Sequence, residues 1–255
     1  MKATRILLTG AALVCFMLLG AVSLKADIYM KQKTHTDGFT MMGQTQPAKD
    51  EFTVTWIARD KSRSDTGDKK TTLMRLDKGL IYEIDHQKKT YREMPLNIKQ
   101  MIDENVAEKG EEAKEFAAMA QEMAEAFAES MEVKVTETPE KKKIGNWNCR
   151  KYIINTSMAM GETVSEAWAS PEVQIDWKNY LMLTNAMMAG SPGFEKMIDK
   201  IYKEMSKVKG MIVLQSNSTK VINTEVKSTT ELLEFGEQNP PAGTYDVPAG
   251  YKKVK

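Results

Sequence analysis

The chain has 255 residues, and its 36 Lys and Arg nearly balance its 35 Asp and Glu, which leaves a formal net charge of +1. Nucleic-acid binding needs a concentrated basic surface, so this composition argues against that class of partner. The length is sufficient for a full hydrophobic core in one large domain or two small ones.

The first 26 residues have the layout of a secretory signal peptide. Lys2 and Arg5 form a basic start, a long uncharged stretch follows, and the small residue Ala26 stands where signal peptidase cuts. We expect cleavage near Ala26, with retention as a membrane anchor as the alternative. Cleavage leaves residues 27–255 as a single exported domain without a stable membrane span. We expect its one cysteine, Cys149, to be a buried apolar residue rather than a reactive thiol.

The first third of the mature chain predicts strands. Residues 51–60, EFTVTWIARD, alternate large apolar residues with threonines, which is typical of a half-buried strand. Residues 27–36 predict a strand at the edge of the sheet, and Asp77-Lys78-Gly79 predicts a hairpin turn. We expect an antiparallel meander with one apolar face, and its further strands are residues 71–77, 80–85 and 90–96.

A helical pattern follows Pro95 and runs from residue 97 to about residue 131, with a break expected at Gly110. Large apolar residues recur at helical spacing on one side, and glutamates crowd the other side. The predicted stripe consists of Phe116, Met119, Ala120, Met123, Phe127 and Met131.

The second half of the chain predicts two more pairs of strands around a second helical block. Residues 137–143, ETPEKKK, are expected to form a loop. Ser191 and Pro192 suit the N-cap and the first position of a helix. The predicted strands are residues 146–158, 162–175, 210–218 and 221–235, the predicted helices are 177–190 and 191–205, and residues 239–255 are expected to lie along the surface.

This order of elements indicates the fold class. Helical segments are not interleaved one per strand, which argues against the parallel α/β folds. We therefore predict an α+β protein whose largely antiparallel sheet has its apolar face covered by the helices.

Motifs for catalysis or cofactor binding do not stand out. The chain has two histidines, His35 and His86, and it contains no metal-binding cysteine pair, phosphate-binding glycine loop or nucleophile elbow. We expect no cofactor and no metal, and we expect that the protein is not an enzyme.

The apolar inventory offers the main functional signal, because 19 residues are methionine. Methionine is flexible and recurs at surfaces that accept varied apolar partners, although ordinary core packing is the alternative. Arg59 and Arg63 are candidates for a rim that contacts an anionic head group, with a solvated strand end as the alternative. The candidate pocket-lining residues are Trp56, Phe116, Met119, Met123, Phe127, Trp168, Met187 and Met197.

Several segments together resemble a bacterial exported family of unknown function. They are TWIARDKSRSD, LIYEIDHQKKTYREM, GNWNCRKYII, SEAWAS and the closing VPAGYKKVK. The family is thought to share the architecture of the lipoprotein carriers LolA and LolB. The resemblance implies an incomplete antiparallel barrel (a half-barrel) wrapped around helices, with an apolar inner surface that accepts acyl chains, in the periplasm.

Two functions follow as hypotheses. The first is a periplasmic protein that binds or carries a hydrophobic ligand, such as a lipid or the acyl chain of a lipoprotein. The alternative is a non-enzymatic interaction or scaffold module of the cell envelope, with a filled core and an envelope protein as its partner. A void between the sheet and its helices favours the first hypothesis, and a tightly filled interior favours the second.

Overall fold

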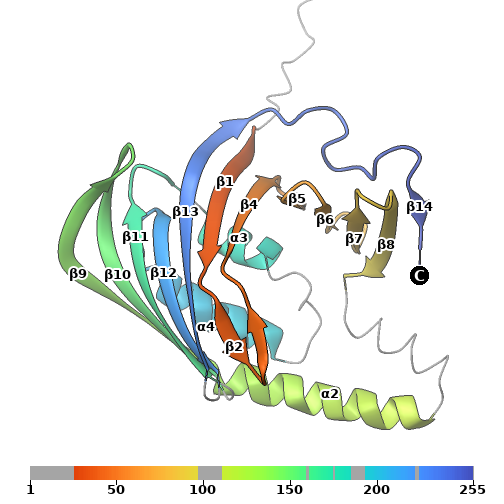
Figure 1. Cartoon of the computed structure of the whole chain (residues 1–255), viewed down its shortest axis with the longest axis horizontal. Coiled ribbons are helices and arrows are strands. Elements are labelled where there is room, and N and C mark those ends of the chain that lie inside the picture. The colour runs from red at the N-terminus through yellow and green to blue at the C-terminus, as the bar shows by residue number, and fades with distance from the viewer. Residues whose placement is uncertain are drawn as a thin grey trace, which may run out of the picture.

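The computed structural model describes residues 26–96, 111–158, 161–174, 176–184, 193–221 and 224–254. In these ranges the protein is mostly β. A 12-stranded sheet holds most of the described chain, and a small separate hairpin is formed by β2 (Phe39–Met41) and β3 (Gln44–Gln46) (Figure 1).

The large sheet follows the chain through two meanders joined in the middle. Its order is β14-β8-β7-β6-β5-β4-β1-β13-β12-β11-β10-β9. The first meander contains β4 (Lys49–Ile57), β5 (Lys61–Thr66), β6 (Lys70–Arg75), β7 (Leu80–Asp85) and β8 (Thr90–Pro95). The second contains β9 (Glu132–Ile144), β10 (Trp147–Met158), β11 (Gly161–Ser170), β12 (Met211–Val221) and β13 (Thr224–Gln238).

β1 (Asp27–Thr36) joins the two meanders, because it pairs with β4 on one side and β13 on the other. The prediction that this segment forms an edge strand is therefore wrong. All pairs in the sheet are antiparallel except the short parallel pair between β8 and β14 (Lys252–Lys253). The sheet ends at β14 and β9, so it is not closed.

The predicted α+β class with a helix-covered sheet is wrong. Helices make up a small part of the described chain: α2 (Glu111–Ser130), α3 (Trp177–Thr184) and α4 (Phe194–Met205). The added strand content comes mainly from strands that were not predicted, namely β2, β3, β5 and β9, and residues 137–143, expected to form a loop, belong to β9. β9 is an edge strand, where lysines and Pro139 are tolerated because they need no further partner strand.

The hydrophobic core lies between α3, α4 and one face of the sheet, which we call the inner face. Trp177, Met205 and Val208 pack against Tyr152, Ile154 and neighbouring residues of β9–β11. Leu183 of α3 packs against a second cluster, which joins Met30 of β1 to Leu232 of β13. Both clusters lie at the β1 and β9–β13 half of the sheet.

α2 covers little of the sheet. Its last turn contacts α4, where Ala128 is buried with Phe194 and Met197. Farther along α2, Met119 and Met123 are 52% and 63% exposed. The prediction that the apolar stripe of α2 covers the sheet is therefore wrong for Met119 and Met123. Within the described ranges, α2 and the other helices are too short or too polar to cross a membrane.

The C-terminal tail packs on the opposite, outer face of the first meander (Figure 1). Leu73, Tyr82 and Ile84 contact Val247 and Tyr251 there. Arg75 Nη1 donates a hydrogen bond to the Tyr245 carbonyl oxygen at 2.9 Å, and Arg63 Nη1 donates to the Thr244 carbonyl oxygen at 3.1 Å. The expectation that the tail lies along the surface holds only in part, because Thr244 and Tyr245 are buried.

Gly210 sets how closely the segment after α4 approaches β11. Its φ is +86°, and a Cβ at this position would lie 1.8 Å from the Ser170 carbonyl oxygen. The next residue, Met211, donates its backbone N–H to the Val173 carbonyl oxygen at 2.8 Å. Only glycine fits this approach, which fixes where α4 leaves the sheet.

Gly210→Ala is expected to destabilise the protein strongly, because it adds a backbone clash to the strain of a left-handed residue. Gly243→Ala is the matched control, since Gly243 has a φ of +78° with nothing within 4 Å of its Cβ position. We expect Gly210→Ala to lower the free energy of unfolding by at least about 2 kcal/mol more than Gly243→Ala. Denaturant unfolding measures both, and equal losses would contradict the close approach.

Candidate functional site

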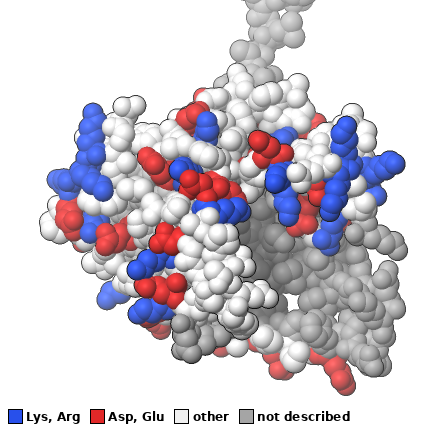
Figure 2. All heavy atoms as spheres, viewed as in Figure 1, with Lys and Arg blue, Asp and Glu red and all other residues white. Residues whose placement is uncertain are grey.

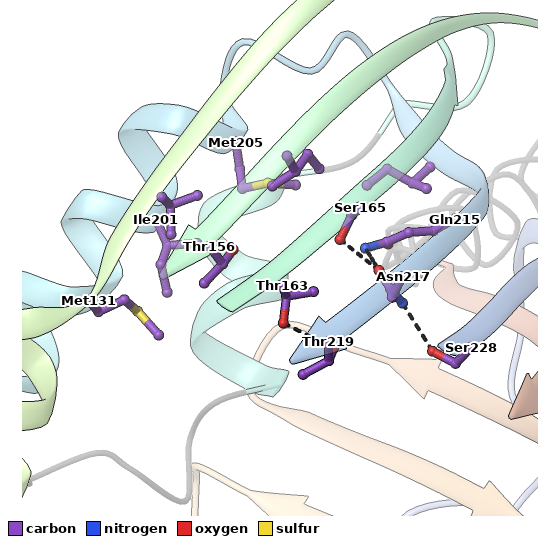
Figure 3. A pocket seen from close by; sticks show the side chains of 13 residues that line it. Met131, Thr156, Thr163, Ser165, Ile201, Met205, Gln215, Asn217, Thr219 and Ser228 are labelled. Carbon is purple, nitrogen blue, oxygen red and sulfur yellow. Dashed lines mark hydrogen bonds between the residues drawn. The ribbon is translucent and has the colours of Figure 1, made fainter. Parts of the chain in front are cut away.

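A groove of about 370 Å³ opens between α4 and the inner face of β9–β13 (Figure 3). Ile201 and Met205 line it from α4, and Met131 lines it from the segment between α2 and β9. The remaining walls are side chains of the strands. A cavity of this size lies within the range that small-molecule sites occupy.

The groove has an apolar side and a polar side. Met131, Ile201 and Met205 lie together on the helical side in Figure 3. The polar side chains lie on the middle strands β10–β13, where alternate residues face the groove because strand side chains alternate between faces. This polar wall consists of Thr156, Thr163, Ser165, Gln215, Asn217, Thr219 and Ser228.

Asn217 is the centre of the polar wall. Its Oδ1 accepts hydrogen bonds from Ser165 Oγ at 2.6 Å and from Gln215 Nε2 at 2.9 Å. Its Nδ2 donates to Ser228 Oγ at 3.4 Å, a long contact. A second pair joins the hydroxyls of Thr163 and Thr219 at 3.0 Å. These cross-strand bonds hold the wall in one arrangement.

A second cavity of about 210 Å³ adjoins the groove and shares Ile201, Met205, Ile212 and Gln215 with it. It reaches toward β1, where Gln32 lines it. Trp177 also lines this cavity, and its Nε1 is buried without an acceptor among the described residues. The two cavities therefore share a wall formed by α4 and β12.

Two charged residues hold α4 in place as the roof of the groove. Glu204 Oε2 accepts the backbone N–H of Val135 at 2.8 Å, and Lys207 Nζ lies 2.6 Å from Glu204 Oε1. The hydrogen bond from Lys207, together with that from Val135, lowers the pKa of Glu204 below its usual value. In the middle of the helix, Lys200 Nζ donates to the Glu129 carbonyl oxygen at 3.1 Å.

The helical candidates lie outside the groove. Phe127 and Met197 come together, but they pack in the cluster between α2 and α4. Met119 and Met123 are exposed. Met187 lies outside the described residues, and so does the side chain of Phe116. The N-cap of α4 is Gly193, so the prediction that Ser191 caps this helix is wrong.

The tryptophan and arginine candidates lie elsewhere as well. Trp56 is on the outer face, with its ring 4.9 Å from that of Tyr29, and Trp168 has Lys142 Nζ 4.1 Å from its ring centroid. Arg63 contacts Asp65 and the C-terminal tail, while Arg59 is exposed beyond β4. Neither arginine forms a rim of the groove.

The residues that do line the groove carried a weak signal in the sequence. In QSNST, residues 215–219, every inward position is polar but uncharged, so alternation of apolar and polar residues gives no hint of an inner face. The resemblance implied an apolar inner surface, and the middle strands differ from that expectation. The expected apolar surface is present mainly on the side of the groove that Met131, Ile201 and Met205 form.

The histidine and cysteine candidates lie away from the groove. No group of three or more His, Cys, Asp or Glu in the described residues could hold a metal ion. His86 contacts Thr71 and Tyr251 through its two ring nitrogens, at 2.7 and 2.9 Å, beneath the C-terminal tail. Cys149 is buried, as predicted, and burial raises the pKa of its thiol.

Charged side chains are mixed over the surface. Figure 2 shows Lys and Arg among Asp and Glu at both ends of the molecule, in keeping with the net charge of +1. Lys151, for example, lies between Glu140 and Glu166, at 3.3 and 3.0 Å.

Asn217→Ala should destabilise the protein by about 1–2 kcal/mol, because Ser165 and Gln215 lose their shared acceptor. Ser216→Ala is the control on the other face of the same strand, where the hydroxyl makes one exposed contact. We expect that control to change stability by less than about 0.5 kcal/mol. Thermal unfolding of both variants checks this, and equal effects would contradict an ordered polar wall.

Stability should fall in acid partly through Glu204. The pKa of Glu204 is lower in the folded state than its usual value of 4.5. As the pH falls, the carboxylate is therefore protonated first in the unfolded state, which favours unfolding. This contribution is complete above that usual value and is lost as the pH falls through the folded-state pKa. Glu204→Gln should therefore show a flatter pH dependence of unfolding below pH 4.5. Urea unfolding of the wild-type protein and this variant at several pH values measures this, and equal slopes would contradict the contribution of Glu204.

No protein-family model matches this chain, and no curated protein matches it. The groove is therefore the main feature of the described residues that bears on function. Its size, its two-sided lining and its position beneath α4 are the observations that bear on function.

Proposed function

We propose that this protein is an exported, periplasmic binding protein that holds or carries a hydrophobic ligand, such as a lipid or an acyl chain, and that it is not an enzyme. The observation that supports the proposal is the groove of about 370 Å³ beneath α4. A filled interior would have favoured the scaffold alternative. The signal-like N-terminus and the resemblance to an exported family support the cellular location.

Burial of apolar surface is the driving force in this proposal. Each CH₂ group removed from water contributes about 0.8 kcal/mol, before the cost of association is subtracted. The branched side chain of Ile201 and the flexible side chain of Met205 can both contact an acyl chain in the groove. Methionine adapts readily to ligands of different shape.

The scaffold alternative has one observation in its favour. Met119 and Met123 form an exposed apolar stripe on α2, which is a common feature of surfaces that contact protein partners. Crosslinking from α2 in the cell envelope would recover such a partner. This role and ligand binding use different surfaces, so the two proposals are tested separately.

The test combines native mass spectrometry of protein purified from its own host with titration of N-phenyl-1-naphthylamine, an uncharged fluorescent probe. We expect co-purified lipid and saturable fluorescence. Thr163→Phe should weaken probe binding by about tenfold or more, because its ring enters the groove. Val164→Phe is the matched control, since Val164 is 43% exposed on the outer face of the same strand.

A clean apo mass together with no probe binding by wild-type protein would refute the ligand-binding proposal. Equal loss of binding in both phenylalanine variants would place the site elsewhere. Circular dichroism confirms that each variant is folded before its binding is compared.

A further inference from the structure

The described walls of the groove carry no formal charge. If the groove is the ligand site proposed above, this property favours uncharged ligands over charged ones. Among the described residues that line the groove and the adjoining cavity, there is no Asp, Glu, Lys, Arg or His. A charged group transferred to such a site loses its hydration without gaining a counter-charge, which is strongly unfavourable.

Two charged residues of α4, Lys200 and Glu204, are already paired. Lys200 Nζ donates to the carbonyl oxygens of Ala128, Glu129 and Met131 at 3.4, 3.1 and 3.4 Å, so its three protons have acceptors. Glu204 is bonded to Lys207 and to the Val135 backbone. Neither side chain can neutralise an ion in the groove without giving up a bond that holds α4.

The polar wall nevertheless has hydrogen-bonding capacity for a neutral head group. Ser165 donates its single hydroxyl proton to Asn217, so its oxygen is left as an acceptor. Ser228 Oγ accepts from Asn217, and no described residue accepts the Ser228 hydroxyl proton. Gln215 donates through Nε2, which leaves its Oε1 as an acceptor. Donors and acceptors are thus both present.

The geometry points to a neutral amphiphile as the ligand. It has one alkyl or acyl chain and an uncharged head group that bears hydroxyl or carbonyl oxygens, as in a monoacylglycerol. The chain lies against Met131, Ile201 and Met205, and the head group lies over Ser165, Asn217 and Ser228. Anionic and cationic lipids of the same chain length are excluded by the walls.

Three ligands with a twelve-carbon chain test this inference by displacement of N-phenyl-1-naphthylamine from the wild-type protein. They are 1-monolauroylglycerol, laurate at pH 8.5 and dodecyltrimethylammonium, each below its critical micelle concentration. We expect monolauroylglycerol to bind more than tenfold more tightly than either ion, because only the ions lose hydration without a partner. A ratio below tenfold for either ion, or failure of monolauroylglycerol to displace the bound probe, overturns the inference.

The outcomes separate this inference from the proposed function. Absence of probe binding in the wild-type protein, with no co-purified lipid, refutes the groove as a ligand site. Probe binding with equal displacement by all three head groups keeps the ligand site and overturns the neutral amphiphile.

A positive charge introduced into the wall should shift the selectivity toward the anionic ligand. Gln215→Lys places an ammonium at the junction of the two cavities and is expected to raise laurate affinity at least tenfold relative to monolauroylglycerol. Ser216→Lys adds the same charge on the outer face and should leave both affinities unchanged. If a folded Gln215→Lys variant keeps the wild-type preference, the head group does not lie on this wall, and the inference is wrong.

Discussion

β1 and β13 come from opposite ends of the chain, and their pairing brings the two meanders into one sheet. The register runs from Asp27 opposite Gln238 to Thr36 opposite Ser228. Because β1 also pairs with β4, Met30 of β1 and Leu232 of β13 enter the same core cluster as Leu183 of α3. The second cavity also depends on this contact, because Gln32 of β1 lines it beside Leu232 of β13. Such a distant pairing must form against a large loop-closure entropy.

The groove exists because the helical cover is smaller than the face it adjoins. α4 has 12 residues, and its buried side chains reach only the β9–β13 end of the inner face. On these same strands, the inner face also carries hydroxyl and amide groups that bond to one another, as Ser165 of β11 and Asn217 of β12 do. Buried polar groups that are satisfied in this way need no helix above them. The result is a surface that is apolar on one side and polar, yet uncharged, on the other.

Local pattern predicted local structure well. The segments 27–36 and 80–85 form β1 and β7 with the expected bounds, and most of the predicted helix 191–205 forms α4, Phe194–Met205. The same reasoning failed for the long helix, because helical spacing shows that a helix has an apolar side but not what that side contacts. Met119 and Met123 of α2 belong to the predicted apolar stripe, yet they are exposed. Likewise, the inward-facing residues of β12 are polar, so their sequence looks the same as that of a strand exposed to solvent on both faces.

The sequence by itself determined the signal-like N-terminus, the balance of charge, most strands and the buried state of Cys149, because each depends on composition or on short-range periodicity. The tertiary structure alone decided the mostly-β class, the central place of β1 and the site residues. Asn217, Ile201 and Met131 come from distant parts of the chain and meet only when the sheet curves beneath α4. No local pattern encodes that meeting, because it depends on long-range pairing and on where each helix leaves the sheet.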